Sequence, residues 1–196
     1  KVAHVEAGIR SFDLSMPEEI NRMVTDSITD YFFTTSEFAN DNLINLGINK
    51  ENIFYVGNTM IDTLLKNETN FLKPKFFDEE NLVFKKYLVL TMHRPSNVDE
   101  NHKLKEFLVT IDNNSINFPV IFPVHPRTSK ILKNLGLKFQ SIIMVSPMPY
   151  LEFNFLVKNS KCVITDSGGI TEETTVMGIP CMTLRDNTER PETVAI

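Results

Sequence analysis

Short apolar runs alternate with amphipathic segments along most of the chain. The apolar runs are rich in β-branched and aromatic residues, which predicts strands. Between them, apolar residues recur at helical spacing, as at Ile20, Val24 and Ile28 behind the helix-start residue Pro17. Strands and helices that alternate in this way indicate parallel sheets built from βαβ units. The predicted strands cover residues 2–7, 30–35, 53–56, 87–92, 120–124, 141–145, 162–165 and 180–184, and the predicted helices cover residues 17–28, 36–46, 102–114, 150–157 and 169–177.

A polar stretch divides this pattern into two series. Residues 69–86 mix charges around Pro74, so we expect them to link two domains. Residues 1–68 then form the C-terminal part of a first Rossmann-like domain, and residues 87–196 form a second doubly wound domain that is incomplete at its C-terminus. Lys1 opens inside an apolar run without an initiator Met, so we expect the chain to be part of a longer protein.

Composition narrows the list of partners. The chain has 196 residues, 42% of them hydrophobic, which suffices for a globular core. Its net charge of -5 lacks the basic excess of a protein that follows a phosphate backbone, so nucleic acid is not an expected partner. No apolar run approaches the roughly 18 residues that span a bilayer, so no membrane is expected. Cys162 and Cys181 lie in apolar surroundings and are expected to be reduced thiols, which favours a cytoplasmic location.

The turn after the predicted strand 162–165 has the features of an anion site. Gly168 and Gly169 directly precede a predicted helix, so their backbone can approach a ligand and present free N–H groups to a phosphate. Ser167 adds a hydroxyl donor, and Glu173, one turn into the helix, can accept hydrogen bonds from ribose hydroxyls. A tight strand-to-helix turn without a ligand explains the same glycines equally well. The Gly-Lys-Ser/Thr ending of a Walker loop is missing.

Acidic residues follow the first predicted strand. His4 and Glu6 are two residues apart, so on a strand they face one side, and Glu18 begins the next helix at the same carboxyl edge. Acidic residues such as Glu18 and Glu19 usually only favour a helix N-terminus. Glu6 is harder to dismiss, because a carboxylate near the end of a buried strand costs free energy unless it is paired.

Two histidines end strands of the second series. His93 and His125 each follow a predicted strand, and an arginine comes close behind, which favours recognition of an anionic substrate. A metal site built from His4, Glu6, His93 and His125 is conceivable, but no tight ligand spacing supports it, so neither a metal nor a cofactor is expected.

Six motifs in a fixed order extend over nearly the whole chain. They occupy residues 4–8 (HVEAG), 17–22 (PEEINR), 57–59 (GNT), 93–94 (HR), 166–170 (DSGGI) and 185–192 (RDNTERPE). Together they resemble the signature of non-hydrolysing UDP-N-acetylglucosamine 2-epimerases. The resemblance implies a GT-B fold, two Rossmann-like domains facing each other across a cleft, with the nucleotide bound by the second.

The resemblance also implies roles for individual residues. Glu6 and Glu18 correspond to catalytic carboxylates, and His93 to a catalytic residue at the diphosphate. The remaining residues would bind the substrate: Ser167, Gly168 and Gly169 at the diphosphate, Glu173 at the ribose, Phe153 at the uracil and Arg190 at the nucleotide or sugar. Full-length members also carry a Gly-Asp-Thr segment with a third carboxylate, which is absent here, so we expect this chain alone to be poorly active.

The implied activity is interconversion of UDP-N-acetylglucosamine and UDP-N-acetylmannosamine, in the biosynthesis of cell-surface polysaccharides. The proton at C2 is not acidic enough for direct removal, so UDP is eliminated to a 2-acetamidoglucal and added back with protonation from the opposite face. The expected partner is a UDP-sugar, and the full-length protein is expected to be a homodimer. Two alternatives remain open: a GT-B glycosyltransferase, and a nucleotide-sugar-binding fragment without turnover.

Overall fold

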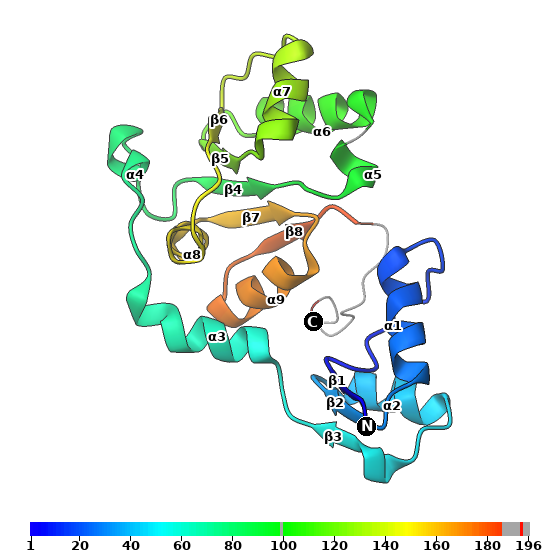
Figure 1. The fold of residues 1–196 in the computed structure, drawn as a ribbon. Helices are drawn as coiled ribbons and strands as arrows, with labels where there is room; N and C mark the ends of the chain where they lie inside the picture. The colour runs from blue at the N-terminus through cyan, green and yellow to red at the C-terminus, as the bar shows by residue number, and fades with distance from the viewer. Residues whose placement is uncertain (99, 186–192, 194–196) are drawn as a thin grey trace. The chain divides into compact units, whose positions relative to one another are not determined.

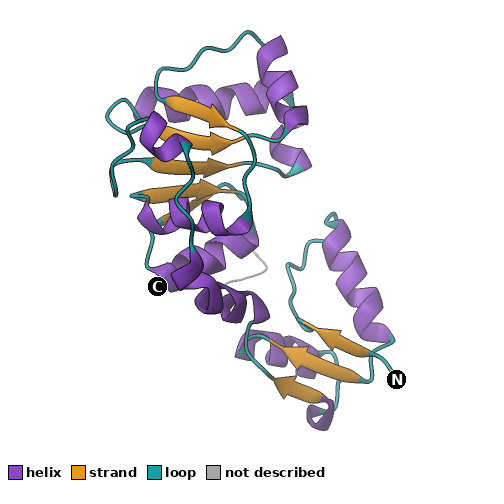
Figure 2. Cartoon of the chain, turned by 60° about the vertical axis from the view of Figure 1, so that its left-hand side comes forward, coloured by secondary structure: helices purple, strands orange, loops and turns teal. Residues whose placement is uncertain are grey.

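The computed structural model describes residues 1–98, 100–185 and 193. Two compact units take up residues 1–65 and residues 66–185 (Figure 1). Within each unit all strands that the structure describes run parallel (Figure 2). Both units are therefore of the α/β type built from βαβ connections.

The first unit contains a three-stranded sheet in the order β1-β2-β3. Its small core joins Phe32 of the middle strand to Ala7 and Leu43. Ser36 caps the second helix, because its side chain accepts a hydrogen bond from the amide of Ala39 at 3.2 Å. The elements of this part of the chain are β1 (Ala3–Val5), α1 (Pro17–Ser27), β2 (Tyr31–Thr34), α2 (Glu37–Asn45), η1 (Lys50–Asn52), β3 (Ile53–Tyr55) and α3 (Thr59–Asn67).

The second unit contains a five-stranded sheet in the order β6-β5-β4-β7-β8. The chain starts at the central strand, moves to one side through β5 and β6, and then returns to the other side through β7 and β8. The order therefore reverses between β4 and β7, which makes this the switch point of the sheet. The elements are η2 (Glu68–Asn70), α4 (Phe76–Glu79), β4 (Leu88–Thr91), α5 (Pro95–Val98), α6 (Asn101–Asn114), β5 (Val120–Pro123), α7 (Pro126–Asn134), β6 (Ile142–Val145), α8 (Tyr150–Asn159), β7 (Cys162–Thr165), α9 (Gly168–Met177) and β8 (Cys181–Thr183).

Alternate residues of the central strands enter two different cores. Leu90 and Ile164 pack with Leu104 of α6 on one face of the sheet. Val89 and Val163 pack on the other face, in a cluster that includes residues of α4, α8 and α9. Strands buried on both faces explain why the sequence shows continuous apolar runs here. None of the described helices combines the length and apolar character needed to cross a membrane.

Every helix and strand predicted from the sequence is present, most of them with shifted ends. The prediction missed α4 and α5, which have only four residues each, and also α3 and α7, which are amphipathic over nine residues and could have been recognised. Residues 69–86, predicted to be a linker, contribute Phe77 and Leu82 to the core of the second unit. The domain boundaries drawn from the sequence stay predictions.

The apolar stripe of the predicted helix 17–28 does not form a core. Val24 and Ile28 are 59% and 64% exposed, whereas the residues of α1 that are buried are Glu19 and Asp26. A buried partner for these carboxylates explains the reversal and is described with the site below.

We expect Gly8→Ala to destabilise the first unit strongly. Gly8 has a φ of +76°, and a Cβ there would lie 2.3 Å from the carbonyl oxygen of Ala39. The free energy of unfolding, measured in urea, should fall by about 3 kcal/mol or more. Gly47→Ala is the matched control, since Gly47 has a φ of +84° but open space around the added Cβ, and should cost only about 1 kcal/mol. Equal losses for both variants would contradict the steric argument.

Candidate functional site

The ends of β4 and β7 meet where the strand order of the second unit reverses, and a fully buried carboxylate joins them. Asp166, directly after β7, accepts hydrogen bonds from the backbone amides of His93 at 3.1 Å and Arg94 at 3.0 Å. The side-chain amide of Asn97 donates to the same carboxylate at 3.0 Å. Arg94 also donates from Nε to the carbonyl oxygen of Asp166 at 3.0 Å. These hydrogen bonds hold the turn after β4 against the end of β7, at the edge where doubly wound sheets bind ligands.

Asp166 also orients the ring of His93. Burial alone raises the pKa of Asp166, but hydrogen bonds from the His93 ring, the Asn97 amide and the Arg94 backbone outweigh it and lower the pKa to about 2. Nδ1 of His93 lies 2.7 Å from Oδ1 of this ionised carboxylate, so Nδ1 carries a proton. The imidazole is 64% exposed, which leaves Nε2 as the ring atom for a ligand.

The N-terminus of α9 follows Asp166 immediately. Ser167 is its N-cap, and its Oγ accepts a hydrogen bond from the amide of Ile170 at 3.4 Å. Gly168 and Gly169 are the first two residues of the helix, where an α-helix supplies no acceptor for the backbone N–H groups. A hydroxyl can donate while it accepts, so the Ser167 hydroxyl remains a donor beside these amides. Such a helix start, next to His93 in the turn after the neighbouring strand, can hold a diphosphate.

A second group of predicted residues lies on α8 and α9, which contact each other. Glu173 is 6% exposed and accepts a hydrogen bond from the hydroxyl of Tyr150 at 2.9 Å. Burial raises the pKa of Glu173, and the hydrogen bond from Tyr150 opposes that rise. Phe153 follows Tyr150 by one turn of α8 and is half-buried against the core.

The structure corrects the interpretation of Glu6. β1 ends at Val5, and Glu6 follows in a turn with a φ of +65°, so the two-residue alternation with His4 does not apply to it. β1 is exposed at both of its ends, and Glu6 is half-buried, so the argument from a buried strand was wrong. A positive φ in a residue other than glycine is uncommon and occurs often at functional sites.

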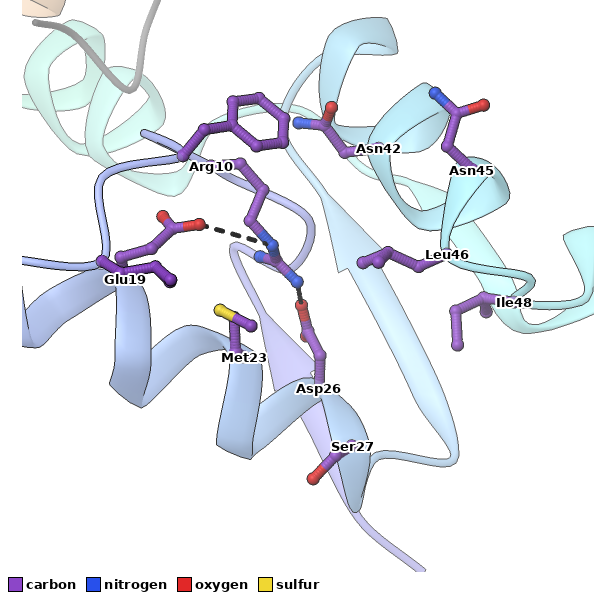
Figure 3. Close-up of a pocket in the computed structure, with 11 residues that line it drawn as sticks. Arg10, Glu19, Met23, Asp26, Ser27, Asn42, Asn45, Leu46 and Ile48 are labelled. Atoms are coloured by element: carbon purple, nitrogen blue, oxygen red, sulfur yellow. Dashed lines mark hydrogen bonds and ion pairs between the residues drawn. The ribbon is translucent and has the colours of Figure 1, made fainter.

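Glu18 is exposed at the second position of α1, whereas its neighbour Glu19 is 2% exposed. Glu19 accepts hydrogen bonds from the amide and hydroxyl of Ser11, at 2.8 and 3.1 Å, and lies 3.9 Å from Nε of Arg10. Arg10, itself buried, donates to Asp26 (Figure 3). Burial raises the pKa of Asp26, but hydrogen bonds from His4 and Arg10 lower it below its usual value. We call Arg10, Glu19 and Asp26 the buried ion triad.

The buried ion triad lies in the wall of a cavity of about 550 Å³ within the first unit. Met23, Leu46 and Ile48 line the same cavity as Arg10 (Figure 3). Sequence reasoning missed Glu19 and Asp26, although their spacing of seven residues places them on one face of α1.

Two further residues of the second unit were missed. The sequence places Asp166 in the glycine turn and Tyr150 at the start of a helix, but a pattern does not reveal which side chains form hydrogen bonds. Arg190, predicted to bind the nucleotide or sugar, lies outside the described residues. Among the described residues, no three His, Cys, Asp or Glu side chains are grouped as metal ligands.

The whole chain, residues 1–196, matches the family model described as UDP-N-acetylglucosamine 2-epimerase. The chain belongs to the UDP-N-acetylglucosamine 2-epimerase family. The epimerase of Methanocaldococcus jannaschii is 46% identical to it over 206 residues, which cover 100% of this chain and 56% of the relative. The UDP-2,3-diacetamido-2,3-dideoxy-D-glucuronate 2-epimerase of Pseudomonas aeruginosa is 38% identical, covering 98% and 54%.

Solved structures of UDP-N-acetylglucosamine 2-epimerases confirm the expected fold. The M. jannaschii enzyme in complex with UDP-GlcNAc and UDP matches with a TM-score of 0.87 and 45% identity, over 100% of this chain and 56% of that one. The enzyme of Neisseria meningitidis bound to UDP-GlcNAc matches with a TM-score of 0.84 and 29% identity, over 99% and 55%. The prediction of two Rossmann-like units of the GT-B type is thus confirmed, and the chain spans about half the length of these relatives.

We expect Asp166→Asn to remove a pH-dependent part of the stability. A carboxylate whose folded pKa is near 2 stabilises the fold above its unfolded pKa near 4, by about 2 kcal/mol, and loses this contribution as the pH falls towards 2. The difference in free energy of unfolding between the unchanged protein and the variant should therefore shrink between about pH 4 and pH 2. Asp78→Asn, at an exposed ion pair with Lys73, is the control and should leave the profile unchanged. A constant difference across this range would contradict the assignment.

Glu19→Ala and Glu18→Ala should differ sharply in stability. Removing Glu19 deprives buried Arg10 of a neighbouring charge and leaves the amide of Ser11 without its acceptor. We expect the free energy of unfolding to fall by about 2 to 3 kcal/mol. The Glu18→Ala variant, changed at an exposed position one residue away, should stay within about 0.5 kcal/mol of the unchanged protein. Thermal or urea unfolding measures both, and similar losses would disprove the contrast.

Proposed function

We propose that the protein containing this chain interconverts UDP-N-acetylglucosamine and UDP-N-acetylmannosamine. The observation that carries the proposal is the arrangement at the ends of β4 and β7, where the His93 ring contacts Asp166 and the N-terminus of α9 follows, in a chain that belongs to the family over its whole length. Elimination breaks the bond between C1 and the UDP oxygen and removes the proton from C2, which yields a 2-acetamidoglucal. Addition of UDP restores the bond at C1, and a proton returns to C2 from the opposite face.

In this proposal the second unit holds the nucleotide. The amides of Gly168 and Gly169, the Ser167 hydroxyl and His93 stabilise the negative charge of the departing diphosphate. The support for His93 is its bond to Asp166, which fixes the ring with a proton on Nδ1. Glu173 accepts the ribose hydroxyls, since its carboxylate is held on α9 and has oxygen lone pairs to offer.

The first unit supplies the acid and base. Glu6 and Glu18 are the proposed catalytic carboxylates, because inversion at C2 requires proton transfer on both faces of the sugar. Their environments differ, since Glu6 is half-buried in a turn and Glu18 is exposed on α1. Two carboxylates in different surroundings can take opposite protonation states. Phe153 at the uracil and Arg190 at the nucleotide or sugar complete the proposed set, with neither a metal nor a cofactor.

The sugar itself admits a second candidate. The relative from P. aeruginosa, 38% identical, is named for a 2,3-diacetamido uronic acid. Epimerisation at C2 of such a sugar needs the same nucleotide site and the same carboxylates. A homodimer, a cytoplasmic location and a role in polysaccharide biosynthesis stay predictions.

Incubation of the full-length protein that contains this chain with UDP-N-acetylglucosamine in deuterated water tests the proposed reaction. We expect deuterium at C2 of the sugar without any added acceptor, because the proton returned to C2 comes from the solvent-exchanged carboxylate. Requirement for an acceptor sugar would identify a glycosyltransferase, and free UDP with N-acetylmannosamine would identify a hydrolysing enzyme. Nucleotide-sugar binding with no exchange at all would leave only a binding protein, and each of these three results would overturn the proposal.

Glu6→Gln and Glu18→Gln should each lower the rate of deuterium exchange by about 100-fold or more, since each removes a proton-transfer group. The affinity for UDP should stay within about twofold, because the proposed nucleotide site lies in the second unit. Glu51→Gln, an exposed glutamate of η1, is the control and should leave both quantities unchanged. Exchange at the unchanged rate in either site variant would remove that residue from the catalytic set.

A further inference from the structure

One side chain beside the proposed ribose site has no role in the function described so far. We propose that Tyr150 is a positioning residue whose hydroxyl holds Glu173 so that the carboxylate accepts the two hydroxyls of a ribose. The ligand class is therefore a ribonucleoside diphosphate, as distinct from a deoxyribonucleoside diphosphate. This inference rests on the proposed function, because it concerns the same nucleotide site.

The contact that carries the inference joins α8 and α9. The hydroxyl of Tyr150, the first residue of α8, donates to Oε1 of Glu173 at 2.9 Å. Glu173 is 6% exposed, whereas Tyr150 is 40% exposed. The phenol therefore holds a carboxylate to which water has little access.

Capacity for hydrogen bonds favours a bound diol. An ionised carboxylate offers about four lone-pair positions, of which Tyr150 uses one. The bond to Oε1 restricts rotation of the carboxylate, so the remaining positions keep a defined direction. Two adjacent hydroxyls of a ribose match two such acceptors, and a sugar without them leaves the acceptors unpaired, which is costly in a buried site.

The Tyr150 hydroxyl also helps to keep Glu173 ionised. Burial raises the pKa of Glu173, and the hydrogen bond from Tyr150 works against that rise. Burial together with the negative Glu173 raises the pKa of Tyr150 to about 12, so the phenol keeps its proton and remains the donor. Without the hydroxyl, Glu173 would protonate more readily and lose acceptor positions.

Helix α8 carries both Tyr150 and Phe153, the residue proposed to contact the uracil base. Tyr150 and Phe153 are three residues apart and so share a side of α8. Phe153 is the residue proposed to pack on the uracil. The same helix turn would therefore contact the base through one ring and align the ribose acceptor through the other.

Binding of two nucleotides to the Tyr150→Phe variant tests the inference. Titration calorimetry should show about tenfold weaker binding of UDP than in the unchanged protein, the effect of a hydrogen bond that supports a charged acceptor. Affinity for 2′,3′-dideoxy-UDP should be the same in both proteins, because this ligand has no hydroxyls for Glu173 to accept. A purely structural role of Tyr150 would weaken both ligands alike.

Tyr87→Phe is the matched control. Tyr87 also donates its hydroxyl to α8, to the carbonyl oxygen of Leu156 at 2.7 Å, but has no bond to Glu173. Its removal should lower the melting temperature and leave the ratio of the two affinities unchanged. A changed ratio in this control would show that any loosening of α8 suffices, which would overturn the inference.

A double variant separates the inference from the function on which it rests. If Tyr150 acts through Glu173, adding Tyr150→Phe to Glu173→Gln should cause no further loss of UDP affinity. A full additional tenfold loss, or equal losses for UDP and the dideoxy ligand, would overturn the inference alone. Failure of the unchanged protein to bind UDP would overturn the proposed function, and the inference with it.

Discussion

The second unit depends on one buried carboxylate at the switch point of its sheet. The carboxylate of Asp166 accepts hydrogen bonds from the backbone amides of the turn after β4 and from the side chain of Asn97. It also lies beside the ring of His93. A buried charge is stable only when such donors surround it, so the same contacts that keep Asp166 ionised hold β4 and β7 at a common edge. Helix α9 begins at this edge with Gly168 and Gly169. The hydrogen bonds of Asp166 therefore also hold the sheet edge at which the anion site is proposed.

The first unit also contains buried charges, and on its helix α1 the charged side chains are buried while the apolar side chains are exposed. Arg10 is buried in the loop before α1, and the helix presents Glu19 and Asp26 to it while its apolar residues stay exposed. Gly8 makes this loop possible, because the chain passes too close to Ala39 for any side chain. The buried ion triad thus ties α1, the helix that carries Glu18, to the loop of Arg10 and, through Asp26, to His4 of β1. The triad is buried, whereas the proposed catalytic carboxylates are less so, with Glu6 half-buried and Glu18 exposed.

Membership of the family supports the proposal that the two units have different roles. The residues proposed for the nucleotide lie in the second unit, and those proposed for proton transfer lie in the first. The chain matches about half the length of its relatives, so the family supplies the reaction only as a proposal for the protein that contains this chain. The proposed ribose contact follows the same reasoning, because a buried acceptor such as Glu173 needs a neighbour such as Tyr150 to keep it charged and oriented.

Hydrophobic periodicity determined the α/β class, the strands and most helices, because burial on one or both faces of an element leaves a direct trace in the order of residues. Motif order determined the family, and the glycine pair after a strand indicated the anion site. Tertiary structure alone decided which carboxylates are buried. Glu18 and Glu19 are adjacent and chemically identical, yet only Glu19 is enclosed, because Ser11 and Arg10 lie beside it. The roles of Asp166 and Tyr150 were likewise decided by partners 73 and 23 residues away in sequence, which local patterns cannot encode.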